Sequence, residues 1–449
     1  MSFIREQLAE FILNKANQHF SREVLHQAKR CLLDFLGVAL ASGKTDLLSS
    51  VFNFVSNNRG KMEATVIGEN FKAPVADAIL INGIKGHTLD MDDGNRFGNV
   101  HPGVVVMPAA LAQAEQIGVK GTALLSAITV GYETLVYIAK SINPSHLKKG
   151  FHTTANVGAF GAAAACCHMM GLNKEQVQNA VSIAGLNAGG LLEVLASGQM
   201  MKPYQTARAS QAGFMSAYLA ENDVEGPERI FEGHNGFFKA YTENEVDQKD
   251  FMDLGEKYEI LNTYFKRFSA CRHVHPALDA VAEILERHTI IPETIKAVEV
   301  RTYSIAYHLT GHRTLDDSAV AAKFSMPISI ALLLSYKDFN KSSYSKERII
   351  NPLVQSIADK VTIKVDPKRD ALYPRERGAE VLIKTVDESY RQIISVPKGE
   401  PENPFSDDDL INKFINNARG CLSPTKAQEI IEVVFDIENN EISSLLGNL

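Results

Sequence analysis

The first 260 residues carry the spacing of helices. After Ser21, a residue suited to cap a helix, the apolar positions of 24–35 recur at steps of three and four. Asn173 with Gln176 resembles a capping box at the start of another such run. Convincing strand alternation is hard to find in this part of the chain. The pattern predicts a large helical domain.

The middle of the chain alternates between apolar and polar residues instead. Ala297–Tyr303 and Lys360–Val365 have the period of strands. Glu380–Val386 and Tyr390–Val396 are expected to pair as a hairpin across residues 387–389. Helical segments are expected near 276–288 and 318–335. These elements together predict a smaller α+β domain.

After the break at Lys398-Gly399-Glu400-Pro401, the chain is helical again. Ser406 is expected to cap a closing helix, and the last fifty residues are expected to return to the first domain. The fold class predicted is mainly α with a smaller α+β domain, the large helical domain being formed by both termini. The expected boundaries are 1–265 for the helical domain, 266–398 for an α+β lid domain, and 399–449 for the returning helices.

One predicted helix has an unusual surface of small side chains. Gly158, Gly161 and the run Ala162–Ala165 follow one another within it. Another helix could approach such a surface closely. The pair Cys166-Cys167 in the same helix is expected to pack rather than to act as a nucleophile.

Composition narrows the class of protein. The 449 residues are 45% hydrophobic and 22% charged, as expected of a soluble globular protein. A net charge of -7 gives no support for nucleic-acid binding. Five cysteines without metal-ligand spacing indicate free thiols in a reducing compartment. The N-terminus lacks the apolar run of a signal peptide, and we expect a cytoplasmic protein without membrane contact.

Three carboxylates lie within four residues, at Asp90, Asp92 and Asp93. Such crowding is tolerated only where cations, hydrogen-bond donors or solvent offset it, and it can shift a carboxyl pKa towards catalytic use. The flanking segments 76–84 and 104–112 are largely apolar, so the cluster is not a solvated acidic tail. The plain structural alternative is an acidic loop that caps the next helix.

Two further residues stand at predicted helix starts. His152 directly precedes the small-residue helix, where a neutral imidazole could serve as a base or a donor, or could simply cap the helix. Lys202 precedes Pro203 and a helix that contains Arg208. It is a plausible clamp for a carboxylate, although most lysines are merely solvated.

A cationic group lies where the β-containing domain begins. It consists of Lys266, Arg267, Arg272, His273 and His275. The two histidines beside Cys271 allow a zinc interpretation, but no second cluster supplies the remaining ligands at familiar spacing. The other interpretation is a cationic wall for a polyanionic substrate. Neither a phosphate-binding loop nor a Gly-x-Ser-x-Gly elbow occurs in the chain.

Taken in chain order, these motifs resemble the MmgE/PrpD family, which includes 2-methylcitrate dehydratases, cis-aconitate decarboxylases and iminodisuccinate epimerases. The motifs that carry the resemblance are Leu32 and Asp34 with Gly37, His87-x-x-Asp90-x-Asp-Asp93 with His101-Pro102, Gly131-Tyr132-Glu133, Phe151-His152-x-Thr154, Lys202, Phe265-Lys266-x-Phe268 with Cys271 and His275, Val381-x-Ile383, and Lys398-Gly399-x-Pro401-x-Asn403-Pro404. Each motif alone is weak, but the ordered set covers nearly the whole chain.

The resemblance implies a homodimer whose catalysis uses neither a metal nor an organic cofactor. It also implies that a set of polar residues lines the active-site cleft: Asp90, His101, His152, Lys202, Lys266 and His275. His273 could take the place of His275. Asp93, Arg96, Arg272 and His273 are the further candidates for substrate binding.

The shared difficulty of the family's reactions is a carbanion next to a carboxylate, which needs a positioned base and nearby cations or donors. On this hypothesis His101 and His152 transfer protons, Asp90 orients an imidazole or takes the proton, and Lys202 and Lys266 bind substrate carboxylates.

The sequence departs from the family pattern at two places. Gly94-Asn95-Arg96 follows Asp93 where members often carry a threonine. The segment Phe324-Ser325-Met326-Pro327-Ile328 has no aromatic residue at the position where relatives often have a tyrosine. The expected activity is therefore that of a lyase on a small di- or tricarboxylate, with dehydration first and decarboxylation as the other lyase outcome. Epimerisation of a substituted succinate is the alternative. A magnesium-dependent helical prenyl-diphosphate enzyme and a catalytically silent carboxylate-binding protein are remote alternatives from other classes.

Overall fold

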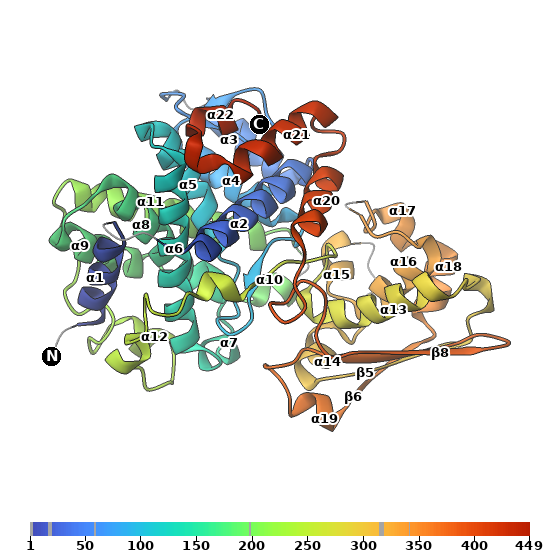
Figure 1. Cartoon of the computed structure of the whole chain (residues 1–449). Coiled ribbons are helices and arrows are strands. Elements are labelled where there is room, and N and C mark those ends of the chain that lie inside the picture. The colour runs from blue at the N-terminus through green and yellow to red at the C-terminus, as the bar shows by residue number, and fades with distance from the viewer. Residues whose placement is uncertain (1–2, 17–19, 58–59, 197–198, 314–317, 341) are drawn as a thin grey trace. The chain divides into compact units, whose positions relative to one another are not determined.

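A computed structural model describes residues 3–16, 20–57, 60–196, 199–313, 318–340 and 342–449 (Figure 1). The chain divides into two compact units, each of which is described by itself. Unit 1 comprises Met1–Thr88, Asp92–Thr263 and Ser406–Leu449, and unit 2 comprises Leu89–Met91 and Tyr264–Phe405.

Unit 1 is built almost entirely from helices. Its α-helices are α1 Ile4–Ala16, α2 Arg22–Ala41, α3 Asp46–Asn57, α4 Val75–Thr88, α5 Gly103–Ile117, α6 Gly121–Ile142, α7 Ser145–Lys148, α8 Thr153–Met170, α9 Lys174–Leu186, α10 Glu193–Ala196, α11 Lys202–Glu221, α12 Phe237–Tyr241, α20 Asp407–Ala418, α21 Pro424–Phe435 and α22 Ile442–Leu446. Its 3-10 helices are η1 Gln248–Phe251, η2 Glu259–Asn262 and η5 Ile437–Asn439, and its short strands are β1 Ala64–Thr65, β2 Lys72–Ala73 and β3 Gly94–Asn95. A further short strand, β4 Thr263–Tyr264, includes the last residue of the second segment of unit 1 and the first residue of the long segment of unit 2.

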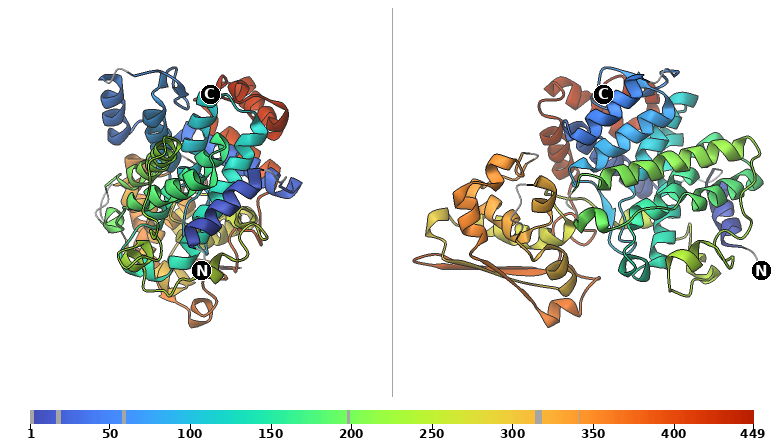
Figure 2. Two further views of the ribbon diagram at one scale, coloured as in Figure 1. Left: turned by 90° about the vertical axis from the view of Figure 1, so that its left-hand side faces the viewer. Right: turned by 180° about the vertical axis from the view of Figure 1, so that it is seen from behind.

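The core of unit 1 depends on the small residues of α8, which packs against α5, α6 and α11 (Figure 2). A Cβ atom added at Gly158 would lie 2.7 Å from Val105 Cγ1, and one at Gly161 would lie 2.7 Å from Leu135 Cβ. From the facing helix, a Cβ at Gly213 would lie 2.5 Å from the Ala159 carbonyl oxygen. The predicted close approach of another helix to this surface is confirmed.

The helix caps expected from the sequence are present. The Ser21 side chain accepts the Val24 N–H at the start of α2. Asn173 with Gln176, and Ser406 with Asp409, form complete capping boxes at the starts of α9 and α20. Each cap satisfies backbone donors that the first turn of a helix leaves without partners.

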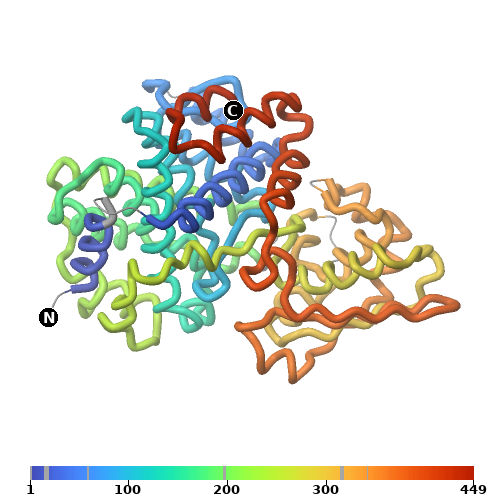
Figure 3. The backbone as a smooth tube through the Cα atoms, in the orientation of Figure 1, coloured from blue at the N-terminus to red at the C-terminus, as the bar shows by residue number. Residues whose placement is uncertain are grey.

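The helices of the C-terminal segment lie beside the early helix α2, as the blue and red tubes in Figure 3 show. Lys413 of α20 donates to Asp34 of α2 at 2.5 Å, and both side chains are buried. The predicted fold class, mainly α with a large helical part formed by both termini and a smaller α+β part, is confirmed.

Helix α6 is long and apolar enough, by composition, to cross a membrane. Most of it is buried inside unit 1, however, as is usual for a core helix.

Unit 2 contains a four-stranded sheet and the helices that cover it. The helices are η3 Arg272–Val274, α13 His275–Arg287, η4 Pro292–Thr294, α14 Ser304–Thr310, α15 Ala319–Lys323, α16 Met326–Tyr336, α17 Lys346–Ile349, α18 Pro352–Ala358 and α19 Pro367–Asp370. The strands are β5 Ala297–Thr302, β6 Val361–Val365, β7 Ala379–Lys384 and β8 Ser389–Ile394, in the order β6-β5-β7-β8.

The strands match the alternation of the sequence. β5 pairs with β6 in parallel and with β7 antiparallel, and β7 pairs with β8 as the predicted hairpin. Val298 and Val300 of β5 point into the core of the unit, which α13 and α16 complete. The turn is 385–388 rather than 387–389, since Lys384 pairs with Ser389.

The helical run expected at 318–335 is two helices rather than one. Ser318 caps α15, and the Ser325 side chain then accepts the Ile328 N–H to cap α16. Pro327 stands in the first turn of α16. A proline is tolerated there because its missing N–H would have no helical partner. The helical prediction is confirmed, with a break between the two helices at Phe324 and Ser325 that the apolar run did not indicate.

The packing of α8 predicts an exception to helix propensity. Alanine normally favours a helix over glycine by about 1 kcal/mol, but Gly213→Ala should destabilise the protein by about 1–3 kcal/mol because its Cβ would overlap the backbone of α8. Chemical denaturation followed by circular dichroism measures the effect. Met215→Ala, at a position 43% exposed on the same helix, is the control. A more stable Gly213→Ala protein would contradict the packing argument.

Candidate active site

Asp92 organises a group of imidazoles in unit 1. His87 lies in the last turn of α4, and its Nδ1 is 2.8 Å from Asp92 Oδ2. The same oxygen is 3.2 Å from Nδ1 of His101, which precedes Pro102 at the start of α5. The His87 and His101 ring centroids are 5.2 Å apart. One buried carboxylate therefore fixes the orientation of two histidines.

The hydrogen bonds of His101 determine which ring nitrogen carries the proton. Nδ1 lies 2.6 Å from the Asp93 carbonyl oxygen, which can only accept. Nδ1–H is therefore the donor, and in the neutral ring the lone pair is on Nε2. A histidine held in this way by a carboxylate and a carbonyl can accept a proton at Nε2 and be stabilised as an imidazolium.

His152 lies at the N-cap of α8, parallel to His87, with ring centroids 6.5 Å apart and 19° between the planes. Burial lowers its pKa well below 6.5, and the charge of Lys202 lowers it further. The imidazole is therefore neutral at pH 7. Its Nδ1 is buried and has no hydrogen-bond partner within the described part of the chain.

Lys202 is the first residue of α11 and is only partly buried. Its electrostatic effect on His152 indicates that the two side chains are near each other. Lys202, His101 and His152 thus belong to one cluster of unit 1, together with His87 and Asp92.

Asp93 has a different environment from Asp92. Tyr132 OH donates to its Oδ2 at 2.6 Å, and the Gly103 N–H donates to its Oδ1 at 3.0 Å. Burial raises the pKa of Asp93 to about 7, and these hydrogen bonds oppose the rise. A Cβ at residue 103 would lie 2.9 Å from both Asp93 Oδ1 and Tyr132 OH, so only glycine fits. Oδ1 of Asp93 thus holds the start of α5 and Oδ2 binds a tyrosine of α6, which is the structural alternative to its predicted role in substrate binding.

The segment after Asp93 is a tight turn. The Asn95 side-chain oxygen accepts the N–H groups of Phe97 and Gly98. Arg96 is buried, with its guanidinium 4.7 Å from the centroid of the Phe97 ring. The residue that differs from the family pattern is thus a buried cation.

In unit 2 the short segment Leu89–Met91 is held by cations and a hydroxyl. Lys266 Nζ donates to the Asp90 carbonyl oxygen at 2.9 Å and lies 3.2 Å from its carboxylate Oδ1. Ser269 and Lys323 both donate to the Leu89 carbonyl oxygen, at 2.5 and 3.0 Å. Asp90 has φ of 53°, a left-handed conformation that costs a non-glycine residue energy. These bonds stabilise that conformation.

Arg272 and His275 form a second buried pair in unit 2. Arg272 Nε and Nη2 each lie 3.0 Å from Glu400 Oε1, and Nη1 donates to His275 Nδ1 at 3.1 Å. The other ring nitrogen, Nε2, donates to the Ala270 carbonyl oxygen at 3.2 Å. Both nitrogens of His275 are therefore committed to the fold, and neither offers a lone pair to a metal. This arrangement disfavours the zinc interpretation.

Among the residues that the structure describes, His273 has a hydrogen-bond partner at Nδ1 and none at Nε2. Its Nδ1 lies 2.7 Å from Tyr303 OH, and the two rings pack edge to face. Burial lowers its pKa well below 6.5, and Arg377, Lys266 and Arg272 lower it further.

Two family models match most of the chain. The MmgE/PrpD N-terminal domain matches residues 6–249, and the MmgE/PrpD C-terminal domain matches residues 268–439. The chain belongs to the MmgE/PrpD family. The predicted resemblance is confirmed.

Several curated MmgE/PrpD relatives align with almost the full chain. Cis-aconitate decarboxylase of Mus musculus is 26% identical over 469 aligned positions, which cover 99% of this chain and 93% of the relative. Cis-aconitate decarboxylase of Homo sapiens is also 26% identical, with 99% and 94% covered. That of Aspergillus terreus is 22% identical, with 99% and 95% covered.

Two residues of this MmgE/PrpD site, His87 and Asp92, were not among the candidates from the sequence. Both belong to the motif His87-x-x-Asp90-x-Asp-Asp93, so the signal was present. Which carboxylate of the run reaches which imidazole depends on the turn between α4 and α5. The spacing of the sequence does not encode that turn.

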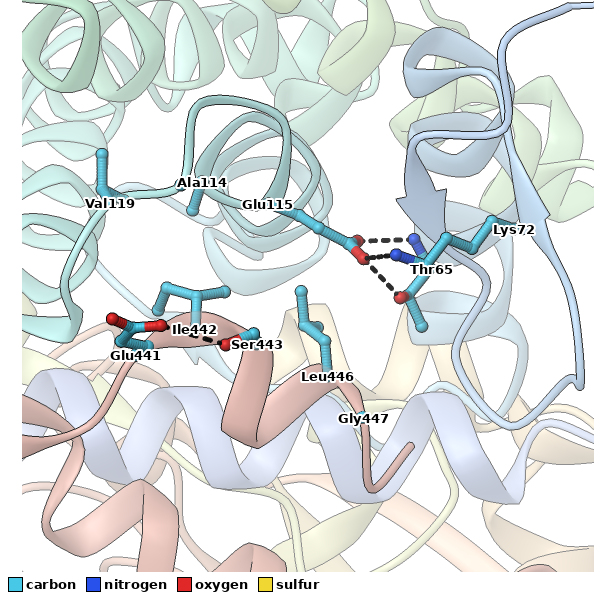
Figure 4. A pocket seen from close by; sticks show the side chains of 11 residues that line it. Thr65, Lys72, Ala114, Glu115, Val119, Glu441, Ile442, Ser443, Leu446 and Gly447 are labelled. Atoms are coloured by element: carbon cyan, nitrogen blue, oxygen red, sulfur yellow. Dashed lines mark hydrogen bonds and ion pairs between the residues drawn. The ribbon is translucent and has the colours of Figure 1, made fainter.

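A pocket elsewhere in unit 1 of this MmgE/PrpD protein is not part of the site. It has a volume of about 330 Å³ and lies between α5 and α22 (Figure 4). Glu115, a partly buried acid of its lining, already accepts from the Thr65 N–H and hydroxyl and pairs with Lys72. None of the predicted site residues lines this pocket.

The environment of Asp93 predicts a pH dependence of stability. Its folded pKa of about 7 exceeds the ordinary value of 3.8, so the folded state holds this proton more tightly than the unfolded state. The contribution of this proton to the free energy of unfolding is complete below pH 4. It is lost as the pH rises towards 7, at up to about 1.4 kcal/mol per pH unit. Asp93→Asn keeps an acceptor for Gly103 and a partner for Tyr132, and it should flatten this part of the profile.

Melting temperatures of the two proteins between pH 4 and 8 measure the difference. Asp387→Asn, in the exposed hairpin turn, is the matched control. Parallel profiles for the wild type and Asp93→Asn would show that Asp93 remains ionised throughout.

Proposed function

We propose that this protein is a lyase of small di- or tricarboxylates that uses no metal or organic cofactor, with decarboxylation of cis-aconitate as the reaction to test first. The observation that carries the proposal is a group of three imidazoles: the buried Asp92 orients His87 and His101, and His152 is stacked on His87. The charge of Lys202 acts on His152. The names of the relatives move decarboxylation ahead of dehydration. The chain is also proposed to be a cytoplasmic homodimer.

The chemistry of the cluster suits the difficult step. In a decarboxylation the C–C bond to a carboxylate breaks, CO2 leaves, and the electron pair stays on carbon until a proton arrives. His101 is proposed to deliver this proton from Nε2, since Asp92 and the Asp93 carbonyl stabilise its imidazolium. The ring then regains a proton from water.

Neutral His152 is proposed to donate a hydrogen bond or to shuttle a proton, while Lys202 binds a substrate carboxylate and stabilises the developing charge. Asp92 positions rather than reacts, because its Oδ2 is occupied by two imidazoles.

For unit 2, taken by itself, cationic groups and a histidine are proposed to bind a carboxylate. Lys266 and Arg272 are held by Asp90 and Glu400, and His273 keeps one ring nitrogen for a substrate. We assign the role predicted for His275 to His273, because both nitrogens of His275 are engaged.

The discriminating experiment is proton NMR of the purified protein in D2O with cis-aconitate, citrate, 2-methylcitrate and substituted succinates. Loss of CO2 with deuterium in the product identifies a decarboxylase. Olefinic products from the hydroxy acids identify a dehydratase. Exchange at a carbon beside a carboxylate without net loss of substrate identifies the epimerase alternative. No exchange and no product across the panel would refute the proposed function.

Substitutions in the cluster test the assigned roles. His101→Ala and His152→Ala should each lower kcat by about 10²–10⁴-fold, the usual contribution of a proton-transfer group, with little change in melting temperature. His234→Ala, at an exposed histidine of unit 1, should leave turnover unchanged. Near-normal turnover in either cluster variant would remove that residue from the mechanism.

The low pKa of His152 predicts where activity fails in acid. If the neutral ring is required, the acid limb of kcat/KM should lie below pH 6.5, because the folded protein keeps the ring unprotonated there. Lys202→Gln removes a charge that lowers this pKa, so it should move the limb to higher pH as well as weaken binding. An unchanged limb in Lys202→Gln would mean that another group titrates.

A further inference from the structure

Unit 2 contains a buried cation that the proposed mechanism does not use. Arg377 lies just before β7 and is only 2% exposed. Arg272 is buried beside it, since the guanidinium groups of Arg272 and Arg377 lie 4.7 and 5.6 Å from the centroid of the same Tyr264 ring. Lys266 is a further buried cation of unit 2. We propose that Arg377 binds a carboxylate group of the substrate. The inference rests on the proposed function and assigns a second anion-binding residue to it.

Two buried acids of unit 2, Asp90 and Glu400, already form ion pairs with other cations. Asp90 pairs with Lys266 at 3.2 Å, and Glu400 pairs with Arg272 at 3.0 Å through two nitrogens. His273 and His275 have lowered pKa values because of burial, so they add no charge at pH 7. Three buried cations therefore share two paired carboxylates, and the excess positive charge lies at Arg377.

The contacts of Arg377 leave its guanidinium available. Within the described residues, no hydrogen bond or ion pair reaches it, and its Nε is buried without an acceptor. It faces an aromatic ring: the guanidinium lies 5.6 Å from the centroid of the Tyr264 ring. Cation–π attraction of this kind is worth about 0.5–2 kcal/mol, and it leaves the N–H donors unused.

The charge of Glu400 also acts on Arg377, but the direct ion pair of Glu400 is with Arg272. Burial of a guanidinium without an acid in hydrogen-bond contact is costly, so a fold that keeps one in this state gains on binding an anion. The planar fork of arginine matches a carboxylate through two parallel N–H···O bonds. Tyr303 and Tyr373, stacked at 4.9 Å, pack against the same region and keep its dielectric low. A small di- or tricarboxylate supplies the missing charge and the matching geometry.

The test uses the full-length protein and the variants Arg377→Gln and Arg377→Lys. Tricarballylate, a saturated tricarboxylate, is the binding probe, and its effect on the melting temperature is the readout that needs no turnover. Arg375→Gln, two residues earlier and exposed, is the matched control. For the substrate that the wild type turns over, KM and kcat are measured separately.

We expect Arg377→Gln to raise KM by about 10- to 100-fold, the value of one charge-assisted bidentate contact, with a smaller change in kcat. The melting-temperature shift with tricarballylate should disappear, while Arg375→Gln behaves as wild type. A wild-type KM and a wild-type shift in Arg377→Gln would overturn the proposal.

Substrate analogues cover the case in which Arg377→Gln does not fold. In each analogue one carboxyl of the substrate is replaced by an amide. The wild type should discriminate against one of these analogues most strongly, and Arg377→Lys should discriminate against that analogue less. Equal discrimination in the two proteins would overturn the assignment. A wild type that neither binds nor converts any carboxylate would instead refute the proposed function itself.

Discussion

The arrangement of this protein depends on how it satisfies charges that it buries. Three carboxylates follow one another within four residues, and each meets a different set of donors: Lys266 for Asp90, two imidazoles for Asp92, and Tyr132 with Gly103 for Asp93. An uncompensated buried carboxylate would cost several kcal/mol. Because each set of donors comes from a different element, the turn between α4 and α5 can adopt few other conformations.

The same division assigns a task to each acid. Asp93 has its donors on α5 and α6 and fixes where α5 begins. Asp92 orients the histidines, so its effect on chemistry is indirect. Asp90 compensates a lysine in unit 2. A run that looks uniform in sequence thus contains one structural, one orienting and one charge-pairing residue.

Local patterns predicted much of the fold. Capping residues such as Ser21 and Ser406, and the alternation in β5, β7 and β8, act through neighbours in sequence, so their outcome could be inferred from the chain alone. The split between α15 and α16 was missed because Ser325 and Pro327 break an apolar run that otherwise has the composition of one helix.

The site was predictable only in part. The residue types and the family motifs indicated His101, His152 and Lys202, which unit 1 brings together, and the assignment of their roles stays a proposal. Whether a histidine is bonded at both nitrogens, as His275 is, or at one, as His273 is, depends on carbonyls and side chains far away in sequence. Nothing in the sequence around Arg377 predicts its burial, since an arginine between a glutamate and a glycine is ordinarily solvated.

The left-handed turn at Asp90 has a consequence for the modularity of the chain. Unit 2 is not a continuous insertion: besides Tyr264–Phe405 it includes Leu89–Met91, which the chain reaches from α4 and leaves again at Asp92. A fragment that begins at Tyr264 would lack the carboxylate and carbonyls that Lys266, Ser269 and Lys323 bind, and would keep a buried ammonium without its acid. Evolution could therefore exchange the second unit between relatives only together with three residues from the first half of the chain, and a recombinant boundary drawn at residue 264 alone would divide an electrostatic unit.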